Sequence, residues 1–190
     1  MSRKPRMSRL LKWAVIVAVC TVLIYGAYMV CLRLAYPQKY EQTVTVYAAE
    51  YHVPPSLVYA IIHTESHFKE DAVSSKGAKG LMQLTDDTYR WVQTKLPADS
   101  RDETAILDPV HNIQSGTKLL AVLHGMFGDD TATVLAAYNA GSTHVTNWLK
   151  DARYSADGKT LTVIPFEETE AYVRRVLQTQ KRYQALYGIE

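Results

Sequence analysis

Cysteine is scarce in this chain of 190 residues, and both copies lie in one short N-terminal segment. Cys20 and Cys31 fall within an apolar run, and residues 43–190 contain no cysteine. The larger part of the chain therefore cannot carry a thiol nucleophile, a disulfide or a thiolate metal site. The chain also has no Gly-x-Ser-x-Gly motif, phosphate-binding loop or dinucleotide fingerprint, so we predict no cofactor.

Acidic residues are absent from residues 1–34, which hold six of the 21 Lys and Arg residues. The remainder has 15 basic and 19 acidic residues, so its net charge is −4 although the whole chain carries +2. A part with this balance lacks the basic surface of a nucleic-acid-binding protein, and we predict no nucleic-acid partner. The length and the ordinary apolar fraction predict one globular domain with an N-terminal appendage.

Charged residues are also missing from residues 13–32, which are mostly apolar. Such a run matches the about 20 residues that a helix needs to cross a bilayer. A cleaved signal peptide would need a shorter apolar core and an Ala-x-Ala-like site. A lipoprotein would need a small residue before its cysteine, whereas Val precedes both Cys20 and Cys31. We therefore expect an uncleaved anchor, and five basic residues before it with only Arg33 just after it predict a cytoplasmic N-terminus.

A helix is predicted over residues 54–64, with Glu65 in its last turn, because proline suits its first turn and apolar residues then recur at helical spacing. Glu65 follows Val58, Ile61 and Ile62 by seven, four and three residues, so it lies on the same apolar face. Partial burial and the negative end of the helix dipole both raise the pKa of a carboxyl group there. A general acid near neutral pH needs such a shift, whereas the alternative is a last-turn glutamate that bends into solvent.

The rest of the chain is predicted to be nearly all α-helical. Asp108 and Pro109 look like a helix N-cap and first position, and Gly141 looks like a C-cap. An apolar-periodic segment opens at Leu81 and continues through Trp91. The other helices are expected over about 43–51, 109–127, 131–139, 145–149 and 167–186, with a loop or small hairpin over 151–164.

Four short motifs occur in order along the chain. They are Glu-Ser-x-Phe at 65–68, Gly-Ala-x-Gly-Leu-Met-Gln at 77–83, Ala-Tyr-Asn-Ala-Gly at 137–141 and Glu-Thr-x-x-Tyr-Val at 168–173. Each motif is weak alone, but together they make the chain resemble the lytic transglycosylases with a soluble-lytic-transglycosylase-type, goose-lysozyme-like catalytic domain. The resemblance covers roughly residues 43–190 and implies a lysozyme-like α-helical fold with a substrate cleft.

The resemblance implies an enzyme that cleaves the bond between N-acetylmuramic acid and N-acetylglucosamine in peptidoglycan. Glu65 would be its single catalytic acid/base and would leave a 1,6-anhydro-muramic end. The family pattern also implies substrate-binding residues, namely Ser74, Met82, Gln83, Tyr138, Asn139, Glu168 and Tyr172. From the residues alone, Ser74 can equally be a plain loop serine, Asn139 can serve a helix end and Glu168 can be a helix N-terminal acid, while Met82 and Tyr172 can be core residues.

Three alternatives remain at this point. A hydrolytic muramidase on the same fold would need a second carboxylate, and the acids near Glu65 in sequence are Glu70, Asp71, Asp86 and Asp87. A catalytically idle wall-binding or scaffold protein would not need the acid. A zinc site at His63 and His67 is disfavoured, because Glu65 does not follow the first histidine directly and no third ligand is evident.

The combined prediction divides the chain into four parts. Residues 1–12 form a basic cytoplasmic tail, 13–32 a transmembrane helix, 33–42 a linker and 43–190 the catalytic domain. We predict a single-pass membrane protein whose catalytic domain lies outside the cytoplasm and faces the cell wall. Its partners would be peptidoglycan strands and the membrane, and no metal is predicted.

Overall fold

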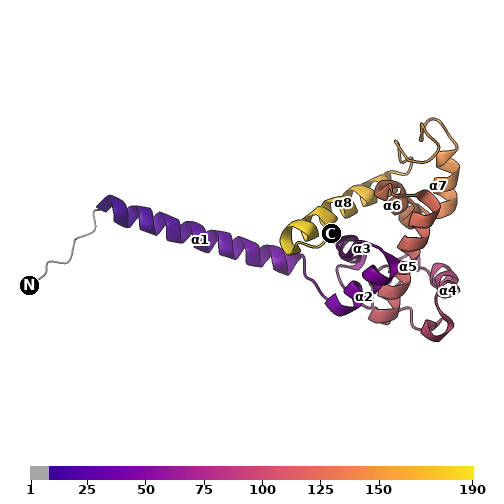
Figure 1. The fold of residues 1–190 in the computed structure, drawn as a ribbon, viewed down its shortest axis with the longest axis horizontal. Helices are drawn as coiled ribbons and strands as arrows, with labels where there is room; N and C mark the ends of the chain where they lie inside the picture. The colour runs from indigo at the N-terminus through magenta and orange to yellow at the C-terminus, as the bar shows by residue number, and fades with distance from the viewer. Residues whose placement is uncertain (1–8) are drawn as a thin grey trace, which may run out of the picture. The chain divides into compact units, whose positions relative to one another are not determined.

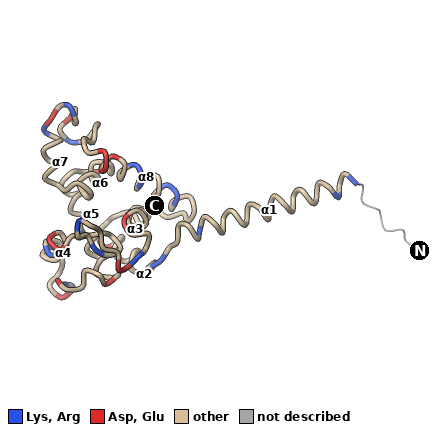
Figure 2. The backbone as a smooth tube through the Cα atoms, turned by 180° about the vertical axis from the view of Figure 1, so that it is seen from behind, with Lys and Arg blue, Asp and Glu red and all other residues tan. Residues whose placement is uncertain are grey.

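The computed structural model describes residues 9–190 and divides the chain into two compact units, residues 1–37 and 38–190. The described residues of the first unit contain one helix, α1 (Arg9–Ala35), which is long and apolar enough to cross a membrane. Of the predicted basic tail, residues 9–12 belong to this helix and residues 1–8 lie outside the described part. Figure 2 shows the stretch of α1 without Lys, Arg, Asp or Glu. Length and composition fit both an anchor and a signal sequence.

The second unit is mainly helical, as predicted, and residues 9–190 contain no β-strand (Figure 1). The helix α5 runs between α4 and α7, which lie apart in both ribbon and tube views (Figures 1 and 2). The elements of the second unit are α2 (Glu41–Tyr51), α3 (Pro55–Ser66), α4 (Asp86–Gln93), η1 (Ala98–Ser100), α5 (Pro109–Phe127), α6 (Thr131–Ala140), α7 (Ser142–Leu149) and α8 (Glu167–Tyr187).

The core of this unit is built around α3. All residues from Ser56 to Ile62 are buried, so the helix is covered on every side before it reaches its last turn. It packs against both α2 and α8. The ring of Tyr59 stacks on Tyr183 of α8 with 5.2 Å between their centroids. This packing fixes the end of α3, where Glu65 lies.

Two predicted helix ends are confirmed by their caps. Asp108 accepts hydrogen bonds from the backbone N–H groups of Val110 and His111, and Pro109 occupies the first turn of α5. Gly141 ends α6 with φ of 94°, a conformation that favours glycine. The predicted bounds of the last helix are met within one residue.

One segment differs from its prediction, and a second settles the choice between a loop and a hairpin that the sequence left open. The periodic segment expected from Leu81 is a turn until Thr85, which caps α4 through the N–H of Thr88. Gln83 has φ of 49°, and this left-handed residue interrupts any helix that begins at Leu81. Residues 151–164 form a loop without strands, in which Asp157 accepts hydrogen bonds from two following N–H groups.

Candidate active site

A cleft of about 360 Å³ opens beside the end of α3. Helices distant in sequence supply its walls, because the end of α6, the middle of α5 and the first turn of α8 all reach it. Its lining residues are Glu65, Ser74, Lys76, Ala78, Gln83, Leu84, Thr85, Thr88, Leu119, Tyr138, Asn139, Ala140, Gly141 and Glu168. The structure therefore brings six of the eight predicted site residues to one cleft.

Glu65 lies in the last turn of α3, as predicted from its apolar face. The helix stops directly after it because His67 and Phe68 adopt left-handed φ values of 50° and 62°. Burial raises the pKa of the Glu65 carboxyl to about 7, while Tyr172 and the positive charge of Arg175 act in the opposite direction. Part of the carboxyl population is therefore protonated at neutral pH, as a general acid requires.

Two tyrosines flank this carboxyl. The Tyr138 hydroxyl donates a hydrogen bond of 2.8 Å to the carbonyl oxygen of Met82. The hydroxyl of Tyr172 is buried, and no group among residues 9–190 meets it with full hydrogen-bond geometry, although its interaction with Glu65 lowers the pKa of that carboxyl. Burial and the nearby Glu65 raise the pKa of both phenols well above the usual value, so both stay protonated and can donate.

The loop before the cleft is closed by its own hydrogen bonds. The Ser74 hydroxyl accepts from the N–H of Ala78 at 3.1 Å, and the two backbones also pair at 2.9 Å. Gly77 and Gly80 both have positive φ, near 78° and 76°. Ser74 therefore shapes the loop and lines the cleft at the same time.

Gln83 and Met82 have different surroundings. The Gln83 amide lines the cleft, and its nitrogen donates to the carbonyl oxygens of Ala72 and Gly80 at 3.0 and 2.9 Å. The amide is thus oriented before any ligand arrives. The Met82 side chain is fully buried and packs where a Cβ on Gly116 would lie. The structure places Met82 in the core, and contact with a sugar would require the loop to move.

The far side of the cleft is formed where α6 ends and α8 begins. Asn139 lines the cleft, and its side-chain oxygen accepts a hydrogen bond of 2.8 Å from Thr169. This bond ties the two helix ends together. Glu168 lies next to Thr169 and forms an ion pair with Lys76 across the cleft.

Asn112 supports the site but was not among the predicted residues. Its side chain is fully buried, accepts from the N–H of Met82 at 2.7 Å and donates to the carbonyls of Ile106 and Lys79. It thereby holds the turn whose carbonyl at Met82 receives the Tyr138 hydroxyl. Lys76 was also missed, and its identity gives no signal because exposed loop lysines are common.

None of the four acids considered as a second carboxylate lines the cleft. Glu70 accepts a hydrogen bond from Tyr40, Asp86 pairs with Lys79 and Asp87 pairs with Arg90. All four are exposed. The acids that do line it are Glu65 and Glu168.

The rings of His63 and His67 lie 4.9 Å apart, centroid to centroid. Within residues 9–190, no group of three or more His, Cys, Asp or Glu side chains is arranged to hold a metal ion. The chemistry available in the cleft is that of the proton-exchanging Glu65 carboxyl, the phenol of Tyr138 with that of Tyr172 beside Glu65, several neutral hydrogen-bonding groups and the Lys76–Glu168 ion pair.

Comparison with known families gives one match over most of the second unit. The family model described as a transglycosylase SLT domain matches residues 42–161. This range contains Glu65 and every predicted site residue except Glu168 and Tyr172.

Individual relatives are similar over the same region. The soluble lytic murein transglycosylase of Escherichia coli K12 is 32% identical over 160 residues, which cover 83% of this chain and 25% of the relative. The membrane-bound lytic murein transglycosylase C of Yersinia pestis is 33% identical over 166 residues, which cover 76% of this chain and 46% of the relative. The chain thus spans about a quarter to a half of these relatives' length.

The fold is also similar to that of a solved structure. An inactive glutamate-to-glutamine mutant of the lytic transglycosylase Slt of Pseudomonas aeruginosa has a TM-score of 0.70 and 31% sequence identity. The match covers 84% of this chain and 26% of that one. The lysozyme-like α-helical fold expected from the motifs is therefore confirmed by structural similarity as well as by sequence.

Proposed function

Because the chain belongs to the transglycosylase SLT domain family, we propose that it is a lytic murein transglycosylase that cleaves the glycan strands of peptidoglycan. The observation that carries this proposal is the carboxyl of Glu65, whose pKa is raised to about 7 in a cleft whose other lining residues, apart from the Lys76–Glu168 ion pair, are neutral. A relative with a similar fold is described as an inactive mutant in which one glutamate became glutamine. Both facts support a reaction that depends on one glutamic acid.

Glu65 acts first as an acid and then as a base. Its protonated carboxyl gives a proton to the oxygen that links N-acetylmuramic acid to the next N-acetylglucosamine, and the bond from that oxygen to the anomeric carbon breaks. The C6 hydroxyl of the same muramic unit then bonds to the anomeric carbon and returns its proton to the Glu65 carboxylate. The product has a 1,6-anhydro-muramic end, and the enzyme regains its starting state.

The internal nucleophile explains how one carboxyl suffices. A hydroxyl held on the same sugar has a high effective molarity, which favours its attack over that of water. Hydrolases of the common kind need a second carboxylate beside the bond. In this cleft the other acid is Glu168, whose exposed carboxylate pairs with Lys76 at 2.9 and 3.0 Å. Because Glu168 is exposed to solvent and none of the four acids near Glu65 in sequence lines the cleft, we favour the transglycosylase over the hydrolytic muramidase.

The neutral groups of the cleft would hold the strand in register. Gln83 is oriented to meet an acetamido group with its remaining amide capacity, and Ser74 and Asn139 offer a hydroxyl and an amide nearby. Tyr138 and Tyr172 would orient Glu65 and the leaving oxygen, while Glu168 would accept hydrogen bonds from sugar hydroxyls. Met82 would support Gln83 from the core instead of meeting the sugar.

Membrane attachment would keep the domain near its substrate. The helix α1 and the similarity to a membrane-bound relative support an anchor formed by residues 13–32. We further infer an N-terminus in the cytoplasm and a catalytic domain, residues 43–190, that faces the wall after a linker of residues 33–42. The charge difference across the span supports this orientation.

The decisive experiment is mass spectrometry of the products released from purified peptidoglycan by the full chain in detergent. Muropeptides with 1,6-anhydro ends, one water lighter than reducing-end products, are expected. Glu65→Gln should release none while it keeps its fold by circular dichroism. Reducing ends would identify a muramidase, and the absence of products from the unaltered chain would identify a binding or scaffold protein.

A further inference from the structure

Lys76 is the one basic side chain that lines the cleft within the described residues. It belongs to the loop between Ser74 and Gly80, and it reaches Glu168 in the first turn of α8. Its ammonium nitrogen lies 2.9 and 3.0 Å from the two carboxylate oxygens. The pair therefore joins opposite walls of the cleft that holds Glu65.

This ion pair is easily exchanged for other contacts. The side chains of Lys76 and Glu168 are 74% and 70% exposed. Exposed pairs add little stability, because water and salt screen them and two long side chains must be held in place. A ligand that enters the cleft can therefore separate the pair at small cost.

Separation of the pair changes what the ligand meets. If Glu168 turns to sugar hydroxyls, as the proposed function requires, the ammonium of Lys76 loses its partner. The other lining residues are neutral except Glu65, which is partly protonated. An ammonium has three donors and a localised charge, so the partner that restores its interaction is an anionic oxygen of the ligand.

We propose that Lys76 is a carboxylate-binding position that selects the muramic units carrying a carboxylate. This inference rests on the proposed function and names the substrate class of the same site. Murein offers two sources of that chemistry: the stem peptide attached to the lactyl group of N-acetylmuramic acid, and the lactyl carboxylate itself where the peptide has been removed. Gln83, Ser74 and Asn139 would bind the neutral acetamido and hydroxyl groups of the sugars.

The test measures binding separately from cleavage. The full chain with Glu65→Gln is titrated with three soluble glycan strands: peptide-bearing strands, strands stripped of peptides, and peptide-bearing strands whose carboxylates have been amidated. With Lys76 intact, at least one of the two carboxylate-bearing ligands should bind about tenfold more tightly than the amidated one, the range of a charge-assisted hydrogen bond. The strand that shows the preference identifies which carboxylate is bound.

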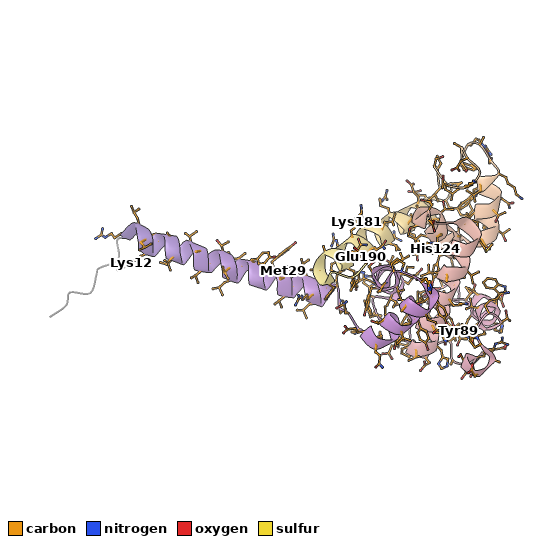
Figure 3. The ribbon with its side chains drawn as sticks, in the orientation of Figure 1. Lys12, Met29, Tyr89, His124, Lys181 and Glu190 are labelled. Carbon is orange, nitrogen blue, oxygen red and sulfur yellow. The ribbon has the colours of Figure 1, made fainter. Side chains whose placement is uncertain are left out.

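Variants assign the preference to the charge of Lys76. Lys76→Met should bring the affinity ratio close to one, and Lys76→Arg should keep most of it. Lys181→Met, on the exposed surface of α8, should keep the full ratio (Figure 3). The ratio should also fall with added salt, because exposed charges are screened.

Two outcomes would overturn the inference. One is a preference that survives Lys76→Met, and the other is a loss of affinity by that variant that is equal for all three strands. Failure of the proposed function gives a different result, because the chain with Glu65 would then release no 1,6-anhydro products from these strands, whatever its preference in binding.

Discussion

The protonation state of Glu65 limits the pH range of the reaction. The carboxyl must be protonated before the bond breaks, and burial raises its pKa to about 7. We expect kcat/KM to fall about tenfold per pH unit above about pH 7, with no acidic limb near neutrality, because the same group supplies both the acid and the base. The measurement is a pH profile on soluble glycan strands between pH 5 and 9. A bell-shaped profile would point to a second titrating group.

The same pKa affects folding. The folded state holds the Glu65 proton more tightly than the unfolded state, so the associated stability is present below about pH 4.5 and is lost as the pH rises to about 7. Glu65→Gln removes this loss. We therefore expect the effect of the substitution on the free energy of unfolding to be about 2 kcal/mol more stabilising at pH 8 than at pH 4, a value reduced for the partial exposure of the carboxyl. Urea unfolding at both pH values measures the difference. Equal effects of the substitution at both values would show that Glu65 is not destabilised by burial.

Residues of the site differ in how far sequence reasoning reaches them. The place of Glu65 on an apolar face could be predicted because its spacing from Ile61 and Ile62 is a local pattern that survives folding, whereas its role as the acid was inferred only from the motifs. Asn112 could not, because its partner Met82 is 30 residues away and its place near the start of α5 suggests only capping. The role of Lys76 could not be predicted from its neighbours in sequence, because its partner Glu168 lies 92 residues later.

At the scale of elements, the turn from Gly80 to Gln83 depends on a close fit with α5. A Cβ at Gly80 would lie 2.3 Å from the side-chain nitrogen of Asn112, and φ there is 76°. Gly77 has nearly the same φ, but nothing lies within 4 Å of its Cβ position. We expect Gly77→Ala to cost about 1 kcal/mol from the backbone alone. Gly80→Ala should cost about 2 kcal/mol more, because Asn112 must shift.

Urea unfolding of the two variants separates these causes. Their shared φ makes Gly77→Ala a matched control for the steric effect at Gly80. The displaced turn should also lower the activity of Gly80→Ala more than that of Gly77→Ala, since Tyr138 binds the carbonyl of Met82 in this turn. Equal losses of stability would mean that Asn112 does not constrain the turn.

Helix ends were predicted well where a capping residue marks them and poorly where backbone strain decides. Asp108, Pro109 and Gly141 act through contacts within four residues, which the sequence displays. The delay of α4 to Asp86 follows from the positive φ of Gln83, which is stabilised by hydrogen bonds to Ala72 and Gly80. The hydrophobic pattern alone cannot report such contacts.

At the scale of the whole chain, the two units are expected to be separable. Residues 38–190 form a compact unit with its own buried core, and α1 has no buried residue. We expect removal of residues 1–37 to leave the thermal midpoint of the catalytic unit unchanged and to move it from the membrane fraction to the soluble fraction. Calorimetry and fractionation after a carbonate wash check the two halves of this prediction.

The orientation of the chain is a separate prediction about the same segment. A helix of 27 residues with basic residues concentrated before its apolar part should remain attached, with its C-terminal side outside the cytoplasm. Protease added to intact spheroplasts should therefore digest the catalytic unit and leave a membrane-bound fragment that contains α1. The intact mass of the membrane-extracted protein supplies the control, because a cleaved signal sequence would shorten it by that segment. Protection of the catalytic unit from protease would reverse the inferred topology and separate the enzyme from the wall.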